Sequence, residues 1–147
     1  DFYGPGGQPP ADFDSGDAAR GAVIKWSTEF PRDYVYIRSI PLPAGVLDPA
    51  KSRGISLWAK ADAPQTLDVS LDHQEDGTYV GFSTPIIVGT EWKRFDLPFT
   101  DFKNRAGVPI SGDMLTSHDW RLTLIALKKT APANGNSVSF DDIVLWK

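Results

Sequence analysis

Short runs of alternating apolar and polar residues follow one another along most of the chain from Gly21 onward. Because successive side chains of a strand point to opposite faces of a sheet, this period of two predicts half-buried β-strands. Stretches rich in Pro, Gly and Asp separate the runs, which is typical of an antiparallel sandwich. The eight predicted strands are AVIKW (22–26), DYVYIRSI (33–40), GISLWAKA (54–61), TLDVSLDH (66–73), TYVGF (78–82), EWKRFDL (91–97), RLTLIAL (121–127) and SVSFDDIVLW (137–146).

Helical periodicity is weak throughout the sequence. No window repeats apolar residues at helical spacing over three turns, and only 47–54 and 101–107 have the composition of a short helical turn. Residues 1–20 are dense in Gly, Pro and Asp, which predicts an irregular N-terminal segment. We therefore expect one all-β domain over residues 1–147. Its expected architecture is a jelly-roll β-sandwich of two antiparallel sheets with about eight to ten strands.

Composition and charge exclude several classes of protein. The net charge of −4 argues against nucleic acid as a partner, because that partner is normally met by a surface rich in Lys and Arg. No stretch approaches the roughly 18 consecutive apolar residues of a membrane helix. The chain has no cysteine, which excludes a disulfide scaffold, a thiol nucleophile and a thiolate metal site. A neutral partner fits this composition better.

The alternation also assigns side chains to the two faces of each predicted strand. The inward set comprises Val35, Ile37, Ile55, Leu57, Ala59, Leu67, Val69 and Leu71. The outward positions of the same runs carry aromatic, charged and hydroxyl side chains, namely Tyr34, Tyr36, Arg38, Ser56, Trp58, Lys60, Asp68, Ser70 and Asp72. Trp and Tyr beside carboxylates and Arg are unusual on a plain solvated face, so this pattern indicates a binding surface.

Sugars suit such a surface, because a pyranose ring packs on an aromatic face while its hydroxyls bond to polar side chains at the edge. The candidate aromatic platforms and hydrogen-bonding partners are Trp58, Tyr36, Tyr79, Asp72, Arg121, Arg38 and His73. Each also has a plain structural interpretation. The aromatic residues would then belong to a packed cluster, and the charged ones to a solvated face whose ion pairs contribute about 0–1 kcal/mol each.

Catalytic motifs are missing from the sequence. It contains no nucleophile elbow, no glycine-rich phosphate loop and no clustered histidine metal site. Paired carboxylates such as Asp68 with Asp72, or Glu75 with Asp76, are the remaining catalytic interpretation. Glycoside hydrolases use one acid and one base or nucleophile about 5–10 Å apart. Because no motif singles out such a pair, we expect a protein that binds and does not catalyse.

Three segments resemble a known family. GISLWAKAD (54–62), EWKRFDLPFTDF (91–102) and SFDDIVLW (139–146) are similar to segments of the carbohydrate-binding modules that have the galactose-binding-like jelly roll. The resemblance implies a sandwich whose concave face or loop edge binds a polysaccharide or oligosaccharide. It also implies a monomeric module, attached to a glycoside hydrolase or lyase in a secreted, extracellular, periplasmic or cell-surface protein. A structural or protein-interaction sandwich of the assembly or adhesion type is the alternative.

The run DFDSGD (12–17) concentrates carboxylates, which suits a hard cation that takes six to eight oxygen ligands. The resemblance adds that the pair Asp141 and Asp142 often includes a ligand to a structural calcium ion shared with an N-terminal segment. We therefore expect structural calcium at Asp141, Asp12 and Asp14. The alternative is a turn and a strand end in which the aspartates only accept hydrogen bonds.

Overall fold

The computed structural model describes residues 11–17, 21–28, 34–127 and 136–147, with side chains described for 39–125 and 138–147. Nine strands lie within this part of the chain, with one 3₁₀ turn, η1 (Phe99–Asp101), and one short helix, α1 (Gly112–Ser117). No helix in these residues is long and apolar enough to cross a membrane. The strands are β1 (Ala11–Asp17), β2 (Gly21–Thr28), β3 (Tyr34–Leu42), β4 (Gly54–Ala61), β5 (Gln65–Glu75), β6 (Thr78–Val88), β7 (Lys93–Pro98), β8 (Trp120–Leu127) and β9 (Asn136–Trp146).

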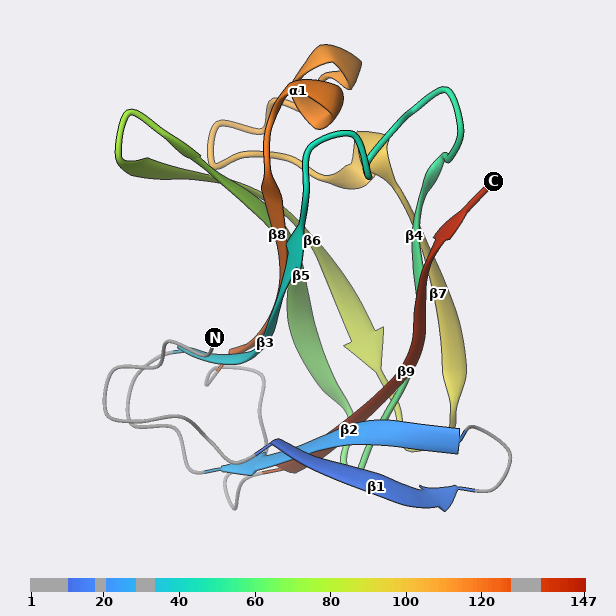
Figure 1. Cartoon of the computed structure of the whole chain (residues 1–147). Coiled ribbons are helices and arrows are strands. Elements are labelled where there is room, and N and C mark those ends of the chain that lie inside the picture. Colours follow the sequence, from blue (N-terminus) through green and yellow to red (C-terminus); the bar gives the residue numbers. More distant parts are fainter. Residues whose placement is uncertain (1–10, 18–20, 29–33, 128–135) are drawn as a thin grey trace.

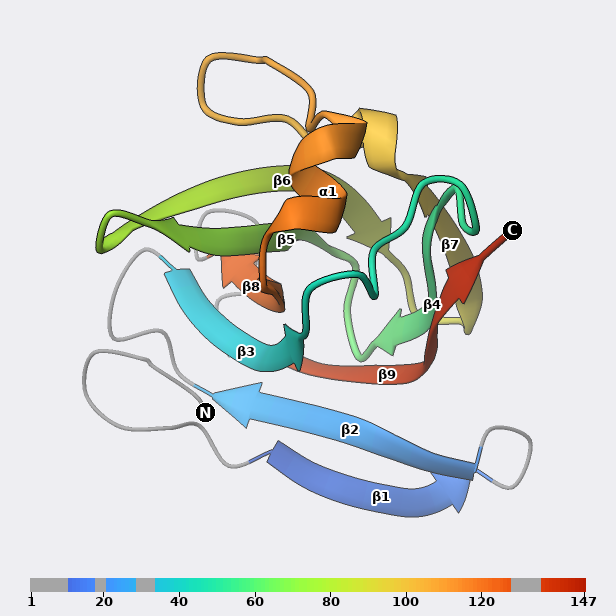
Figure 2. The same ribbon diagram turned by 45° about the horizontal axis from the view of Figure 1, so that its top comes forward.

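These strands form two antiparallel sheets. The five-stranded sheet has the order β1-β2-β9-β4-β7, and the four-stranded sheet has the order β3-β8-β5-β6. The two sheets face each other, and α1 lies across one end of the sandwich (Figures 1 and 2). The all-β class and the two-sheet architecture expected from the sequence are therefore confirmed.

The core lies between the sheets and is built from the alternate residues that the sequence pattern assigned inward. Ile55, Leu57 and Ala59 from one sheet, and Leu67, Val69 and Leu71 from the other, are each at most 1% exposed. Val35 and Ile37 were assigned inward as well, but their side chains lie outside the described ones. Because alternate residues of β5 fill the core, the residues between them must face outward.

The irregular segment predicted for residues 1–20 is wrong over Ala11–Asp17, which forms strand β1. This strand pairs with β2, for example through Phe13 opposite Ile24, and has a register shift between Asp14 and Asp17. Pairing with a neighbouring strand overrides local composition, because β-propensity depends more on context than helix propensity does. The acid-rich run 12–17 is consequently part of a strand and not a loop.

The predicted strand 78–82 continues to Val88 and forms a long hairpin with β5. Asp76 and Gly77 make its two-residue turn, with φ values of 49° and 78°. Positive φ at both central residues is typical of a type I′ turn, whose twist matches that of the two strands in a hairpin. Pro85 is tolerated because β6 is an edge strand, where a backbone donor can be dispensed with. The hairpin projects past the rest of the sheet (Figure 1).

The two segments with the composition of a helical turn, 47–54 and 101–107, do not contain the helix. The helix forms instead at Gly112–Ser117, where the Ser111 side chain accepts a hydrogen bond from the backbone amide of Met114. This N-cap bond satisfies one of the amides that the first helical turn leaves unpaired. Leu115 anchors the helix to the core, at 1% exposure.

Candidate functional site

Cross-strand pairing aligns the outward residues of the four-stranded sheet into rows that run across all its strands. One row, here named the charged row, consists of Pro41, Arg121, Asp72 and Gly81. Residues directly opposite each other in an antiparallel pair lie on the same face, with Cβ atoms about 4.5–5.5 Å apart. Arg121 and Asp72, two of the predicted ligand contacts, are thus neighbours on this face.

A second row, here named the hydroxyl row, lies next to the charged row and consists of Ser39, Thr123, Ser70 and Ser83. Ser70 and Thr123 are only 5% and 3% exposed, although they belong to the outer face of the sheet. The Oγ of Ser39 is buried and has no hydrogen-bond partner among the described residues. The two central hydroxyls are therefore almost completely closed to solvent, and they are available mainly to neighbouring side chains.

The Asp72 carboxylate is held in place on this face by a short hydrogen bond. Its Oδ1 accepts a hydrogen bond of 2.7 Å from Ser70 Oγ. Partial burial raises the pKa of Asp72, and this effect outweighs the hydrogen bonds from Ser70 and Thr123 and the positive charge of Arg121, all of which lower it. Asp72 thus presents a carboxylate that is fixed by donors and partly withdrawn from water.

Tyr79 stands at the hairpin end of the same face. It pairs with Gln74, lies two residues from Gly81 along β6, and is 63% exposed. Gly81 is exposed too, so the backbone of the edge strand is open beside the charged row. An exposed aromatic ring next to an uncovered backbone segment offers a flat apolar surface beside hydrogen-bonding groups.

The backbone of β3 completes the face, but the side chains of Tyr36 and Arg38 lie outside the described ones. Tyr36 pairs with Ile125, whose partner on β5 is Asp68, so its register position belongs to the next row of the outer face. A register shift lies between Tyr36 and Arg38, and Arg38 pairs with Leu124. The simple alternation that assigned both residues to one face does not continue across this shift.

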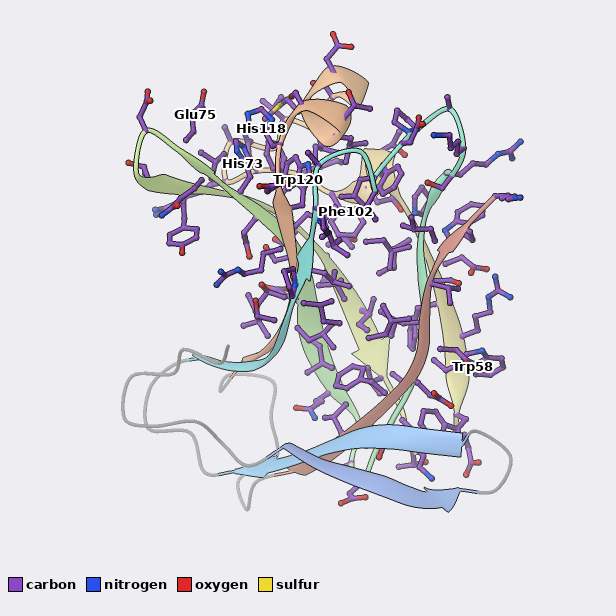
Figure 3. The ribbon with its side chains drawn as sticks, viewed as in Figure 1. Trp58, His73, Glu75, Phe102, His118 and Trp120 are labelled. Atoms are coloured by element: carbon purple, nitrogen blue, oxygen red, sulfur yellow. The ribbon has the colours of Figure 1, made fainter. Side chains whose placement is uncertain are left out.

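Trp58 does not share a face with Asp72 or Arg121. It lies in β4 of the five-stranded sheet, where it is half-buried and pairs with Arg94 on one side and Asp141 on the other. Figure 3 shows it beside β7, on the side of the sandwich away from His73. The alternation correctly predicted that the Trp58 side chain points outward. It could not show which strands share a sheet, so the predicted sugar contacts lie on two different surfaces.

The prediction that His73 contacts a sugar is wrong, because His73 lies on the core side of β5. It is 2% exposed, and its ring centroid is 4.3 Å from that of His118 and 4.7 Å from that of Trp120 (Figure 3). Neither of its ring nitrogens has a hydrogen-bond partner among the described residues. The residue after an outward Asp72 must face inward, so His73 cannot take part in the same surface as Asp72.

The surroundings of His73 favour its neutral form. Burial lowers its pKa most, and the neighbouring His118 lowers it further, against smaller opposing effects of the Gln74 backbone, Glu75 and Asp72. A neutral imidazole can be buried against Trp120, whereas a charged one without a partner would be costly there. His73 is therefore part of the packing beneath α1.

Of the three residues predicted to bind calcium, only Asp141 has a described side chain. Asp141 Oδ2 is buried without a hydrogen-bond partner among the described residues, while Oδ1 accepts from the Asp142 amide at 2.8 Å. The aspartates Asp12 and Asp14 lie in β1, and their side chains are outside the described ones. Within the described side chains, no group of three or more His, Cys, Asp or Glu residues could hold a metal ion.

Sequence reasoning did not identify the partners of Asp72, namely Ser70, Thr123 and Gly81. Ser70 was assigned to the outward face by alternation, but nothing local marked it as a partner of Asp72. The juxtaposition of Thr123 and Gly81 with Asp72 depends on pairing with strands far away in the sequence. This juxtaposition can be seen only from the register of the strands.

No protein-family model and no curated protein matches this chain. Solved structures do match. A family 11 carbohydrate-binding module from Clostridium thermocellum, in complex with a β-1,3-1,4-mixed-linked tetrasaccharide, has a TM-score of 0.72 and 20% sequence identity. The match covers 97% of this chain and 85% of that one.

Two further structures are more distant. A family 30 carbohydrate-binding module of the cellulosomal cellulase Cel9D-Cel44B from Clostridium thermocellum has a TM-score of 0.55 and 11% identity, covering 97% of this chain and 83% of that one. An exo-β-agarase has a TM-score of 0.52 and 12% identity, covering 93% of this chain and 22% of the agarase chain. At these identities the likeness establishes the fold, and the predicted jelly-roll sandwich is confirmed.

The raised pKa of Asp72 gives a first testable prediction. An acid whose pKa is raised by folding adds stability below its ordinary pKa and loses that contribution as the pH rises through the raised value. Ionised Asp72 is therefore a cost at pH 7, and Asp72→Asn should unfold at the same or a higher denaturant concentration than the unchanged protein. Its advantage should shrink as the pH is lowered toward 3. The prediction would be contradicted if Asp72→Asn were less stable than the unchanged protein and if this loss were larger at pH 7 than at pH 4.

His73 gives a prediction of the opposite sign. A base whose pKa is lowered by folding adds stability above its ordinary pKa of about 6.5 and loses that stability as the pH falls toward the folded value. The free energy of unfolding should accordingly decrease on acidification below about pH 6.5. His73→Phe, which keeps an aromatic ring beside Trp120, should flatten this dependence in denaturant titrations between pH 5 and 7. An unchanged slope would show that His73 is not responsible.

Proposed function

We propose that the outer face of the four-stranded sheet binds a polysaccharide or oligosaccharide and does not cleave it. The observation that carries this proposal is the charged row, in which Asp72 is fixed by buried hydroxyls beside Arg121 and close to the exposed ring of Tyr79. A carboxylate accepts hydrogen bonds, a guanidinium donates them, and sugar hydroxyls do both. An aromatic ring supplies the apolar contact that a sugar ring needs.

The direction of the rows supports an extended ligand that crosses the strands. The charged row and the hydroxyl row each include one residue from every strand of the sheet. The uncovered backbone at Gly81 lies at the β6 edge, where an extended ligand can continue beyond the sheet. Contact with a chain of several sugars is therefore favoured over capture of a single monosaccharide.

The spacing of the carboxylates argues against glycosidase chemistry at this face. Asp68 and Asp72 are four residues apart in β5. At about 3.3 Å per residue their Cα atoms are about 13 Å apart. Hydrolases hold their two carboxyl groups about 5–9.5 Å apart. The other pair considered, Glu75 and Asp76, lies at the exposed hairpin turn, away from the charged row.

The structural neighbours support the same proposal at a coarser level. One of them is a carbohydrate-binding module with a tetrasaccharide, and another is a module of a cellulase. The agarase, of which this fold covers 22%, is an example of such a sandwich within a longer carbohydrate-active chain. We extend the proposal accordingly to a module that works beside a catalytic domain of a secreted protein, where it would bring a glycoside hydrolase or lyase to its polysaccharide.

Affinity electrophoresis against neutral and acidic polysaccharides, including a mixed-linked β-1,3-1,4-glucan, tests this function. We expect at least one glycan to retard the protein. Asp72→Ala and Tyr79→Ala should each weaken that binding by about tenfold or more, as expected for a lost hydrogen bond to a charged group or a lost aromatic contact. Mobility that no glycan changes would overturn the proposal.

Trp58→Ala tests whether the glycan binds the four-stranded sheet or the five-stranded sheet. Because Trp58 lies on the other sheet, its removal should leave the retardation unchanged, whereas the melting temperature reports any loss of packing. Loss of binding in Trp58→Ala, with binding retained in Asp72→Ala, would move the site to the five-stranded sheet. Melting curves of all three variants distinguish lost contacts from lost folding.

We also propose a structural calcium ion at Asp141, with Asp12 and Asp14 from β1 as further ligands. The support is the buried Asp141 Oδ2, which lacks a described partner, because calcium binds carboxylate oxygens. A ligand that binds only the folded state raises its stability by mass action. EDTA should consequently lower the melting temperature, and added calcium should restore it, with Asp141→Asn losing this response. Identical melting curves with and without EDTA would contradict the calcium proposal.

A further inference from the structure

We infer that three positioning residues, Ser70, Thr123 and Gly81, fix the Asp72 carboxylate in one place, over Gly81 of the edge strand β6. In this place the carboxylate is a preformed hydrogen-bond acceptor for the ligand. The inference rests on the proposed function of this face. The two hydroxyls do not need to touch the ligand. Ser70 and Thr123 are almost completely buried, at 5% and 3% exposure, so their hydroxyls act through Asp72.

Gly81 leaves the space that the carboxylate occupies. A Cβ added at Gly81 would lie 2.6 Å from Asp72 Oδ1 and 3.7 Å from Ser70 Oγ. Real Cβ atoms essentially never approach another atom that closely, so any side chain at this position has to displace the carboxylate. Gly81 is not in the left-handed region of φ, where glycine would be required by conformation. The glycine is therefore needed for space, and that space is filled by Asp72.

Ser70 donates a hydrogen bond to the same oxygen. Its Oγ is 2.7 Å from Asp72 Oδ1 and 3.3 Å from the Phe82 carbonyl oxygen. A hydroxyl has one proton, and a charged acceptor forms the shorter and stronger bond, so the proton goes to the carboxylate. Thr123, directly opposite Ser70 on β8, supplies a second hydrogen bond to Asp72. Donors from two strands and a gap on a third thus define one position of the carboxylate.

Such an arrangement favours binding because the acceptor is already in place. A free Asp side chain would have to be ordered when the ligand binds, which reduces affinity. A fixed one has lost that freedom on folding. The partial burial of Asp72 also strengthens any hydrogen bond that it accepts, because the local dielectric is lower than that of water. If the carboxylate is displaced, both advantages disappear while Asp72 itself is still present.

The test uses Gly81→Ala, Ser70→Ala and Thr123→Val, with Gly89→Ala as the matched control. A Cβ at Gly89 meets nothing within 4 Å, and its φ is not positive. Two quantities are measured for each protein. The first is the pKa of the Asp72 carboxyl in the ligand-free protein, followed by NMR. The second is the affinity for the mixed-linked β-1,3-1,4-tetrasaccharide or for the glycan that binds in electrophoresis.

The two kinds of variant should change the pKa of Asp72 in opposite directions. Ser70→Ala and Thr123→Val each remove a donor to the carboxylate, so the pKa should rise further. Gly81→Ala should push the carboxylate toward water and return the pKa toward its ordinary value, because burial is the main cause of its rise. All three should bind the glycan about tenfold more weakly, whereas Gly89→Ala should leave both quantities unchanged.

Opposite pKa changes with unchanged glycan affinity would overturn the positioning role. An Asp72 pKa that no variant alters would show that the carboxylate does not occupy this place. If the unchanged protein binds no glycan, the proposed function fails, and the pKa pattern still reports separately whether the three residues fix Asp72. Should Gly81→Ala fold poorly, Thr123→Val decides the matter, since its change in shape is small and it removes only the donor.

Discussion

The antiparallel pairing of β5 with β6 on one side and β8 on the other determines almost every feature of the candidate site. Alternate residues of β5, namely Leu67, Val69 and Leu71, are buried between the sheets, and those between them face outward. A shift of the register by one residue would exchange the two sets and expose the core. The burial of the hydrophobic residues that precede Asp72 along β5 therefore places its side chain on the outer face.

The same register combines two opposing requirements at Asp72. Burial of the carboxylate raises its pKa and makes its charged form a cost to stability, but the charged form is the better acceptor for a ligand. Hydroxyls from β5 and β8 and the guanidinium of Arg121 offset part of that cost. Proteins commonly retain such local costs where binding needs a fixed polar group. The sandwich core supplies the stability that this arrangement uses.

Most of the fold could be predicted from the sequence, because alternation and turn residues are local signals. The inward positions of β4 and β5 were predicted correctly, as was the two-sheet class. Strand β1 was missed because its residues favour turns and its partner is β2. Trp58 and Asp72 were grouped together because alternation reports the direction of a side chain within one strand and does not report which sheet the strand joins.

The candidate site was predictable only in its individual members. Asp72 and Arg121 were chosen for their chemistry, and the structure pairs them, whereas His73 is in the core. No local signal shows that Gly81 and Thr123 lie beside Asp72, since their proximity results from contacts between distant parts of the chain. A binding face made of one residue from each strand cannot be assembled before the order of the strands is known.

The proposed glycan-binding surface is the outer face of the four-stranded sheet. A titration of the ¹⁵N-labelled protein with the mixed-linked β-1,3-1,4-tetrasaccharide, followed by NMR chemical shifts, is the sharpest test of this location. We expect the amide shifts of Arg121, Asp72, Gly81 and Tyr79 to change, with little change around Trp58. Changes centred on Trp58 and β7, with none along the charged row, would contradict it.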